Sequence, residues 1–411
     1  MHNKHWLSSS RSLYLIVLSM IVSALVLAGG LYFVTRTIAA SLDNADTAAN
    51  WVSSDSTILT SSQETTIKQE GTGSVKLSTP SWYNYSWPYR IKLTIDATKV
   101  DADLTDFPVY VNLVDLPASF HSHVNQTDAR DIRVTKSDGT TELPREVVFY
   151  TAASDTGELH VKYSGTLSGT SNTDIYLYYG NTGATNYAVT DTYGTQNVWD
   201  TNYKGVWHLT ESTGTHYDST SNNNDSTTVA VTTQGTANAK IGGADDFDAT
   251  NDYINFGTGS SLDLSTNGTL EAWIYPNGYG EGGFGNIYFR GAGASVGYNL
   301  YTRASTTNIA IWDGVSTAST GTVSLNQWTY AVATINGTNT IFYINGSGDA
   351  GHSWTMDSSG VDPLYVGSEN GADTFDGQID EARISSTPRS STWISTQYNN
   401  QNSSSTFYAE G

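Results

Sequence analysis

Side chains that carry oxygen gather in three polar stretches, and their composition suits the binding of a calcium ion. Asp218–Asp225 is a run of Asp, Ser, Thr and Asn, Asp248–Asp252 contains two acids and an asparagine, and Glu369–Asp373 lies near a further acid, Asp380. Calcium takes about six to eight oxygen ligands from carboxylates, carbonyl groups and water. The alternative is that these acids accept hydrogen bonds from local backbone N–H groups in turns. The candidate calcium ligands are Asp218, Asp248, Asp252, Glu369, Asp373 and Asp380.

Four aromatic residues are candidates for contact with a ligand. Tyr279 and Phe284 lie in the glycine-rich stretch 277–286, and Trp312 and Trp354 come later in the chain. A ring on a loop can stack on the face of a sugar, and exposed aromatic residues are the informative exception on a protein surface. We therefore predict that these four rings bind the ligand. The competing interpretation is that the rings of the loop fold back onto a sheet.

The acids needed to hydrolyse a glycosidic bond are not suitably paired. That reaction needs two carboxylates about 5–9.5 Å apart at one sugar ring. On a strand, this means two acids two positions apart, since neighbouring side chains point to opposite faces. Asp380 and Glu381 are adjacent, so we expect them on opposite faces, and Asp248, two residues after Asp246, opens a turn. We therefore predict no catalytic residue.

The composition excludes several functional classes. The 411-residue chain has 19 Lys and Arg against 40 Asp and Glu, a net charge of −21 that argues against nucleic acid as a partner. It has no cysteine, which excludes disulfides, thiol catalysis and zinc–thiolate sites. Its 26 tyrosines and 11 tryptophans, without long helical periodicities, predict a mostly β protein with aromatic cores.

The N-terminal region contains an uncharged apolar run, Leu13–Val34. As a helix, this run would be long enough to cross a bilayer, and the basic residues before it predict that the N-terminus stays inside. Val26–Ala28, followed by glycines, also fits a signal-peptidase site. Both the uncleaved anchor and the cleaved signal place the rest of the chain outside the cytoplasm. We divide this region into an anchor or signal, 1–39, and a polar stalk, 40–79.

Short alternating strands separated by turn residues begin near Trp82 and predict an antiparallel sandwich. The segments WPYRIKLTIDATKV, LTDFPVYVNL and TDIYLYYGN resemble a domain of undescribed function that often precedes laminin-G-like modules in prokaryotic surface proteins. The resemblance covers about residues 80–197 and implies a location, but no activity. Asp131 and Glu146 stand where that family also has acids, and we expect them to serve turns and the surface.

The remaining half, about residues 198–411, resembles a laminin-G-like (concanavalin A-like) jelly-roll module. The resemblance is carried by IGGADDFDATNDYINF, TLEAWIYP, NQWTYAVATINGTNTIFYING and LYVGSENGADTFDGQIDEARIS, in this order. It implies two facing sheets, with ligands held at rim loops or on a concave face and calcium at edge loops. Within it, we expect Trp207, Trp273 and Trp328 in the core and a closing helix at Ser391–Asn399.

Taken together, these features predict a mostly β protein with an N-terminal transmembrane or signal helix and two antiparallel β-sandwich domains, the second a concanavalin A-like jelly roll. We expect a cell-surface recognition or adhesion protein, not an enzyme, that binds a carbohydrate or a surface protein through rim loops. It would be anchored by its N-terminal helix or secreted after cleavage. Two alternatives stay open, a glycoside hydrolase on the same fold and a structural filament or envelope subunit.

Overall fold

The chain forms two units by its internal contacts, Met1–Pro80 and Ser81–Gly411. In Met1–Pro80, the described part is an antiparallel hairpin of β1 (Thr66–Glu70) and β2 (Ser74–Ser78). The predicted anchor or signal and most of the predicted stalk lie outside the described residues. The structure, a computed structural model, describes residues 66–70, 74–78, 82–236, 238–291, 297–312, 314–356 and 362–411.

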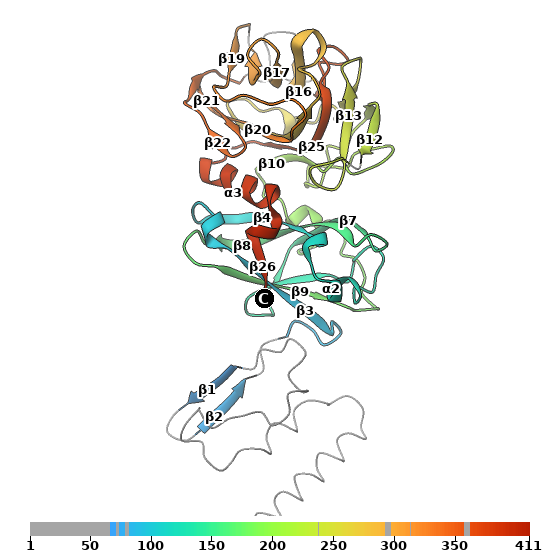
Figure 1. The fold of residues 1–411 in the computed structure, drawn as a ribbon, viewed down its shortest axis with the longest axis vertical. Helices are drawn as coiled ribbons and strands as arrows, with labels where there is room; N and C mark the ends of the chain where they lie inside the picture. The colour runs from blue at the N-terminus through green and yellow to red at the C-terminus, as the bar shows by residue number, and fades with distance from the viewer. Residues whose placement is uncertain are drawn as a thin grey trace, which may run out of the picture. The chain divides into compact units, whose positions relative to one another are not determined.

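The first sandwich of Ser81–Gly411 packs a five-stranded sheet, β26-β3-β9-β5-β6, against a three-stranded sheet, β4-β8-β7 (Figure 1). Alternating side chains such as Leu93, Val109 and Leu177 fill the space between the sheets and are fully buried. This agrees with the antiparallel pattern expected from the sequence. The strands are β3 (Tyr89–Ile95), β4 (Leu104–Asn112), β5 (Arg133–Lys136), β6 (Glu142–Leu143), β7 (Arg145–Thr151), β8 (Thr156–Leu167), β9 (Thr173–Tyr179) and β26 (Tyr408–Glu410), with a short helix, α2 (Ala118–His121).

The second sandwich packs a nine-stranded sheet against a seven-stranded sheet, β11-β14-β24-β16-β17-β18-β19. The path of the nine-stranded sheet is β12-β13-β25-β15-β20-β21-β22, with β10 beside β25 and β23 beside β21. Its strands are β10 (Tyr203–Trp207), β12 (Thr233–Thr236), β13 (Ala244–Asp248), β15 (Asn267–Pro276), β20 (Thr329–Asn336), β21 (Asn339–Ile344), β22 (Ser347–Gly348), β23 (His352–Ser353) and β25 (Asp376–Ser385). The other strands are β11 (Thr228–Ala230), β14 (Tyr253–Asn255), β16 (Phe284–Arg290), β17 (Tyr298–Arg303), β18 (Asn308–Trp312), β19 (Ser316–Ala318) and β24 (Leu364–Val366).

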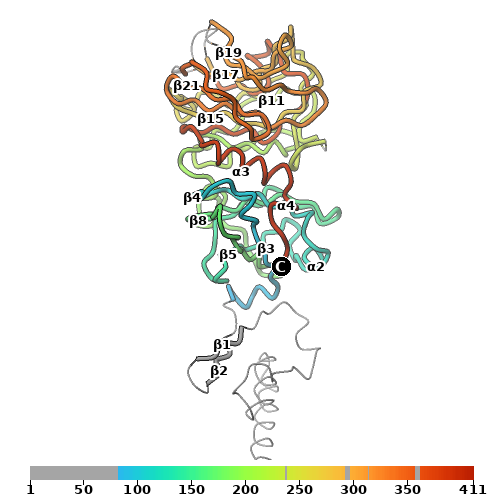
Figure 2. Tube along the Cα trace, turned by 60° about the vertical axis from the view of Figure 1, so that its left-hand side comes forward, coloured from blue at the N-terminus to red at the C-terminus, as the bar shows by residue number. Residues whose placement is uncertain are grey.

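The C-terminal segment returns from the second sandwich to the first. Helix α3 (Ser391–Asn402) lies between the two sandwiches, as Figures 1 and 2 show, and is followed by α4 (Ser404–Phe407). The Asn400 side chain bonds both the N–H and the C=O of Tyr110 on β4. Strand β26 then pairs with β3. The expected closing helix is confirmed and extends further, but the expected 198–411 division differs from the structure, because its last residues complete the sheet of the first sandwich.

One outer face of the second sandwich is buried. On the nine-stranded sheet, Trp273, Tyr330 and Val332 join the same apolar cluster as the core of the first sandwich. Trp207, in contrast, lies in the second sandwich's own core. Trp273 and Trp207 are therefore both buried as expected, but on opposite faces of their sheet, and Trp328 is partly buried against the shared cluster. The two sandwiches meet through a continuous apolar layer.

Candidate functional site

A bulge in β25 directs two adjacent acids toward the first sandwich. On β15, Trp273 pairs with Asp380 and Glu271 pairs with Arg383, so the two residues between them on β25 face one residue of β15. Glu381 takes the left-handed conformation, with φ 52°, which the bulge requires. Its neighbours Ile379 and Ala382 stay in the core of the second sandwich. The expectation that Asp380 and Glu381 point to opposite faces is therefore wrong, because the extra residue resets the alternation.

One oxygen of the Asp380 side chain is held by backbone groups, whereas the other, Oδ1, is buried and makes no hydrogen bond to a described residue. Its Oδ2 accepts hydrogen bonds from the N–H groups of Lys240 (2.9 Å) and Ile241 (2.8 Å), in the connection between β12 and β13. Burial and the neighbouring charge of Glu381 raise the pKa of Asp380 well above its usual range. Its partners are not in the loop Glu369–Asp373, so the structure does not bring Asp380 together with that candidate calcium loop.

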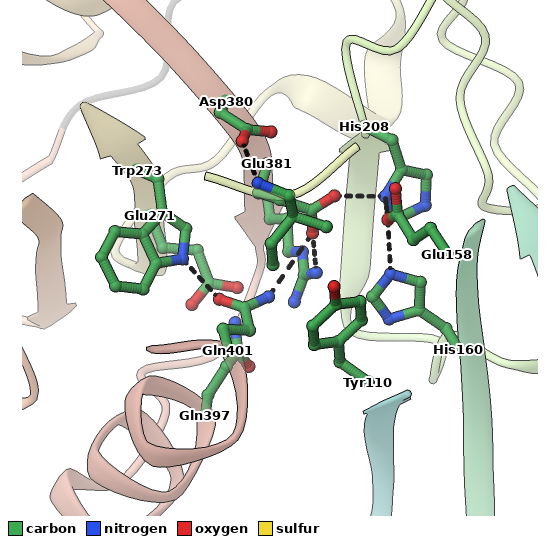
Figure 3. Close-up of polar contacts among 12 residues, drawn as sticks. Tyr110, Glu158, His160, His208, Glu271, Trp273, Asp380, Glu381, Gln397 and Gln401 are labelled. Atoms are coloured by element: carbon green, nitrogen blue, oxygen red, sulfur yellow. Dashed lines mark hydrogen bonds and ion pairs between the residues drawn. The ribbon is translucent and has the colours of Figure 1, made fainter. Parts of the chain in front are cut away.

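Glu381 is the centre of a buried polar cluster at the junction of the two sandwiches (Figure 3). Its Oε1 lies 2.5 Å from His208 Nδ1, and its Oε2 pairs with the guanidinium of Arg383. Burial alone would raise the pKa of Glu381, but the charges of His208 and Arg383 outweigh it and lower that pKa. Burial alone would lower the pKa of His208, but the surrounding glutamates raise it well above its usual range.

The first sandwich supplies the other half of this cluster. Glu158 and His160 lie two positions apart on β8, so both point from the same face of the strand. His160 Nε2 lies 2.8 Å from Glu158 Oε1, which is itself 3.0 Å from His208 Nδ1. On the other side, Glu146 on β7 accepts hydrogen bonds from Trp199 Nε1 and Ser219 Oγ. Polar groups of both sandwiches are thus joined inside the junction.

Asp131 and Glu146 were expected to serve turns and the surface, and the surface part of this prediction is wrong, because they are 0% and 5% exposed. Asp131 accepts hydrogen bonds from the N–H groups of Asn125 and Gly180, which close two loops of the first sandwich. Glu158 and His160 belong to the cluster but were not among the predicted site residues. Their alternation with apolar residues indicates that they share one face of β8. It does not indicate which residues they contact.

The acids of the predicted calcium loops mostly bind their own backbone. Asp218 accepts hydrogen bonds from the N–H groups of Val206, Thr220 and Asn224, and burial raises its pKa to about 6. Asp252 accepts from the N–H group of Asp248 at 3.1 Å. These contacts are those of the turn interpretation, in which acids cap loops. The predicted ligands are therefore distributed over separate loops.

The loop Glu369–Asp373 differs, because its acids repel one another. Burial and then Asp373 raise the pKa of Glu369, while burial and then Glu281 raise the pKa of Asp373. A bound cation would relieve this repulsion. Calcium at this loop stays a prediction.

The four aromatic candidates occupy different environments. Phe284 and Trp312 are 43% and 38% exposed, on strands β16 and β18 of the seven-stranded sheet. Tyr279 is half-buried and donates a hydrogen bond to the carbonyl of Val323 at 3.2 Å. Trp354 is only 4% exposed and lies in the core of the second sandwich. Burial therefore removes Trp354 from the candidate ligand-binding surface and leaves the exposed pair Phe284 and Trp312.

Residues 247–395 match a laminin G family model, described as the concanavalin A-like lectin/glucanases superfamily. The chain contains a concanavalin A-like domain. This bears out the expected jelly roll, and the concanavalin A-like domain has the lectin-like fold that the sequence motifs implied. A comparison with curated proteins finds no match.

Solved structures resemble this chain at low identity. Domain 4 of AbnA, a GH43 extracellular arabinanase from Geobacillus stearothermophilus, in complex with arabinotriose, is 16% identical over 48% of this chain and 98% of that chain, with a TM-score of 0.37. The botulinum neurotoxin serotype D binding domain is 15% identical over 48% of this chain, with a TM-score of 0.37, and only 51% of that chain is covered. A SAP-like pentraxin from Limulus polyphemus is 14% identical over 33% of this chain and 70% of that chain, with a TM-score of 0.28. At these scores, the likenesses carry no argument about function.

A pocket of about 500 Å³ lies beside the buried cluster, between the first sandwich and the concanavalin A-like domain. Glu146 and His208 line it together with Glu211, Asp218 and Asp225, so it is acidic. The carboxylates of Glu146, Glu211 and Asp218 are engaged in hydrogen bonds with their own surroundings.

Among the described residues, no helix has both the length and the apolar character to cross a bilayer. The apolar run Leu13–Val34 lies outside that part of the chain.

His216 gives the concanavalin A-like domain a testable pH dependence. Its Nδ1 and Nε2 each lie 2.7 Å from a carboxylate oxygen, of Glu211 and Asp245 respectively, and Gln234 packs beside Nε2. Burial alone would lower the pKa of His216, but these two carboxylates raise it to about 9. A raised histidine pKa stabilises the fold below the unfolded value of about 6.5, and the stabilisation is lost as the pH rises through about 9.

We therefore expect the free energy of unfolding to fall by about 2–3 kcal/mol between about pH 6.5 and pH 9 through this group. Urea unfolding at several pH values measures it. The dependence of the free energy of unfolding on pH should become weaker in His216→Gln. It should persist in His123→Gln, a control at a half-exposed histidine. Equal slopes in the wild type and His216→Gln would contradict the assignment.

Proposed function

We propose that this chain is a non-enzymatic recognition protein of the cell surface that binds a glycan through the outer face of its seven-stranded sheet. The observation that carries the proposal is the exposure of Phe284 and Trp312 on that sheet, whereas the outer face of the nine-stranded sheet is buried against the first sandwich. Exposed aromatic rings on a sheet or its rim mark binding surfaces, since their burial by a ligand is favourable.

Contacts across β16, β17, β18 and β19 link the two rings. Phe284 lies 6.0 Å, centroid to centroid, from Tyr301 on β17. The Tyr301 hydroxyl lies 2.7 Å from Ser316 Oγ, and Ser316 pairs with Trp312 between β18 and β19. Arg303, which donates to the same Ser316 hydroxyl, adds a cation. A surface that combines rings, hydroxyls and one guanidinium offers both stacking and hydrogen bonding to a sugar.

The placement of Asp380 and Glu381 supports binding over hydrolysis. Both are buried and bound to internal partners, so they do not offer a carboxylate pair to a substrate.

Two further features concern location and calcium. The uncharged run Leu13–Val34 supports a location outside the cytoplasm, either anchored or secreted. Calcium at Glu369–Asp373 would order a loop next to β16, since Asn286 N–H donates to the Asp373 carbonyl.

A glycan array with purified protein tests the proposal. We expect capture of at least one glycan class and about tenfold or greater loss in Phe284→Ala and in Trp312→Ala, since a ring at the centre of a contact contributes more than about 1 kcal/mol. Tyr85→Ala is the matched control, because Tyr85 is 90% exposed and lies in the segment before the first sandwich. An EGTA arm, with calcium added back, reports whether the metal supports binding.

Three results would argue against the proposal. Silence across all glycans favours the structural class, which ordered polymers in electron microscopy would support. Equal loss in Tyr85→Ala would show a non-specific aromatic effect. Cleavage of a captured polysaccharide would favour the glycoside hydrolase.

A further inference from the structure

Four metal-ligating side chains converge inside the junction of the two sandwiches. Glu158 and His160 come from β8 of the first sandwich, His208 directly follows β10, and Glu381 lies at the bulge of β25 (Figure 3). One ligand atom from each lies within 4.8 Å of all the others. All four side chains are buried, with exposed fractions between 0% and 5%. The group therefore combines two imidazoles with two carboxylates, and so differs from a cluster of acids alone.

Neighbouring ligand atoms lie at hydrogen-bond distance, closer together than they would be around a metal ion. His208 Nδ1 lies 2.5 Å from Glu381 Oε1 and 3.0 Å from Glu158 Oε1, and His160 Nε2 lies 2.8 Å from Glu158 Oε1. A tetrahedral metal ion about 2.0–2.2 Å from nitrogen and oxygen ligands holds these atoms roughly 3.3–3.6 Å apart. A small outward movement of each side chain would make room for the ion.

Protons alone satisfy this cluster poorly. His208 Nδ1 carries at most one hydrogen, yet a carboxylate oxygen from Glu381 and another from Glu158 both approach it. The second oxygen of Glu158, Oε2, is buried and makes no hydrogen bond to any described residue. Buried carboxylates are costly unless they are paired or bind a metal. A divalent cation could bind carboxylate oxygens of both Glu158 and Glu381.

The surroundings orient the ligands. His208 Nε2 faces Glu146 Oε2 at 3.5 Å, on the side of the ring away from the cluster. No hydrogen bond joins the two atoms in this structure, but a small movement of the ring would bring Nε2 into range, and a carboxylate there would fix the tautomer of a metal-bound histidine. Glu146 is in turn held by Trp199 Nε1. On the other side, Arg383 and Gln401 hold Glu381 Oε2.

The acidic pocket of about 500 Å³ lies next to the cluster. His208 and Glu146 line it, and the charges of Glu211, Asp218 and Asp225 would concentrate cations there. Cations gathered there would lie next to one of the four ligands, His208.

We propose that Glu158, His160, His208 and Glu381 bind one divalent transition-metal ion of the zinc class, and that this ion joins the first sandwich to the concanavalin A-like domain. Imidazole ligands suit zinc and its neighbours, whereas calcium prefers six or more oxygens at a more open site. The site is distinct from the glycan surface, and none of its four ligands is a predicted calcium ligand, so it does not depend on the proposed function.

The test uses the full chain without a histidine tag. Elemental analysis after purification without chelator, and zinc titration of EDTA-treated protein by calorimetry, should show one equivalent. We expect His160→Gln to weaken zinc binding by at least about tenfold and Glu146→Gln, a positioning residue, by about 10–100-fold. The matched control is His216→Gln, which removes another buried histidine between two carboxylates and should bind zinc like the wild type.

Cobalt provides a measurement that does not depend on the variants. Co²⁺ added to the EDTA-treated wild type should give the intense visible absorption of a tetrahedral nitrogen and oxygen site, and zinc should abolish it. If His160→Gln does not fold, this spectrum of the wild type still shows whether a tetrahedral metal site is present. The proposal is overturned if the wild type binds no zinc, if folded His160→Gln binds it unchanged, if His216→Gln loses it equally, or if the cobalt spectrum is octahedral.

Discussion

Arg383→Met is expected to lower the free energy of unfolding by about 3–5 kcal/mol, because it removes one partner of a buried ion pair and leaves His208 as the remaining cation beside Glu381. Arg383 is buried, its guanidinium pairs with Glu381, and it lies 4.9 Å from the ring centroid of Trp199. Methionine keeps much of the apolar volume, so the loss should come mainly from electrostatics and not from a cavity. Urea unfolding in the presence of EDTA measures the effect without a contribution from any bound metal.

The matched control is a surface ion pair. Arg130 Nε lies 2.8 Å from Asp128 Oδ1, with both side chains largely exposed. We expect Arg130→Met to leave the unfolding curve unchanged, since solvent screens such pairs. If Arg383→Met unfolds at the same urea concentration as the wild type, the junction does not depend on this charge.

Phe407→Ala is expected to lower the free energy of unfolding by about 3–5 kcal/mol, which is the usual cost of removing a buried phenylalanine ring. Phe407 is fully buried in the core of the first sandwich, and its carbonyl accepts a hydrogen bond from Asp96 N–H at 2.9 Å. The substituted residue lies at the end of the chain, more than two hundred residues after β9. Hydrogen exchange should therefore show lost protection on β3 and β9 before β16 and β17.

Phe284→Ala is the control for this prediction. Its ring is 43% exposed on the second sandwich, so we expect a change in the free energy of unfolding well below that of Phe407→Ala. Lost protection confined to β16 and β17 in Phe407→Ala would contradict the assignment of the C-terminal segment to the first sandwich.

The features that the sequence predicted are those that depend on local pattern. Alternating strands separated by turn residues indicated both sandwiches, and the motif order indicated the jelly roll. The burial of Trp207 follows from its apolar neighbours, and helix α3 begins where Ser390 caps it. Each of these depends on residues that are close in sequence.

The predictions that were wrong concern acids whose positions depend on a bulge or on partners far away in sequence. Asp380 and Glu381 were placed on opposite faces because strict alternation was assumed, and a bulge at Glu381 breaks it. Asp131 and Glu146 were expected at turns and on the surface because acids are usually exposed; Asp131 does bind loop backbone, but both acids are buried, and Glu146 meets a residue of the second half of the chain that the pattern does not reveal.

Hydrophobic alternation and turn residues specify sheets locally, so the β-sandwiches could be predicted from the residue pattern alone. That β26 completes the first sheet, and that Glu158, His160, His208 and Glu381 meet in one place, became apparent from the three-dimensional arrangement. The difference follows from distance along the chain. These four side chains come from segments far apart in sequence, and their proximity depends on how two sandwiches dock, which no local periodicity encodes.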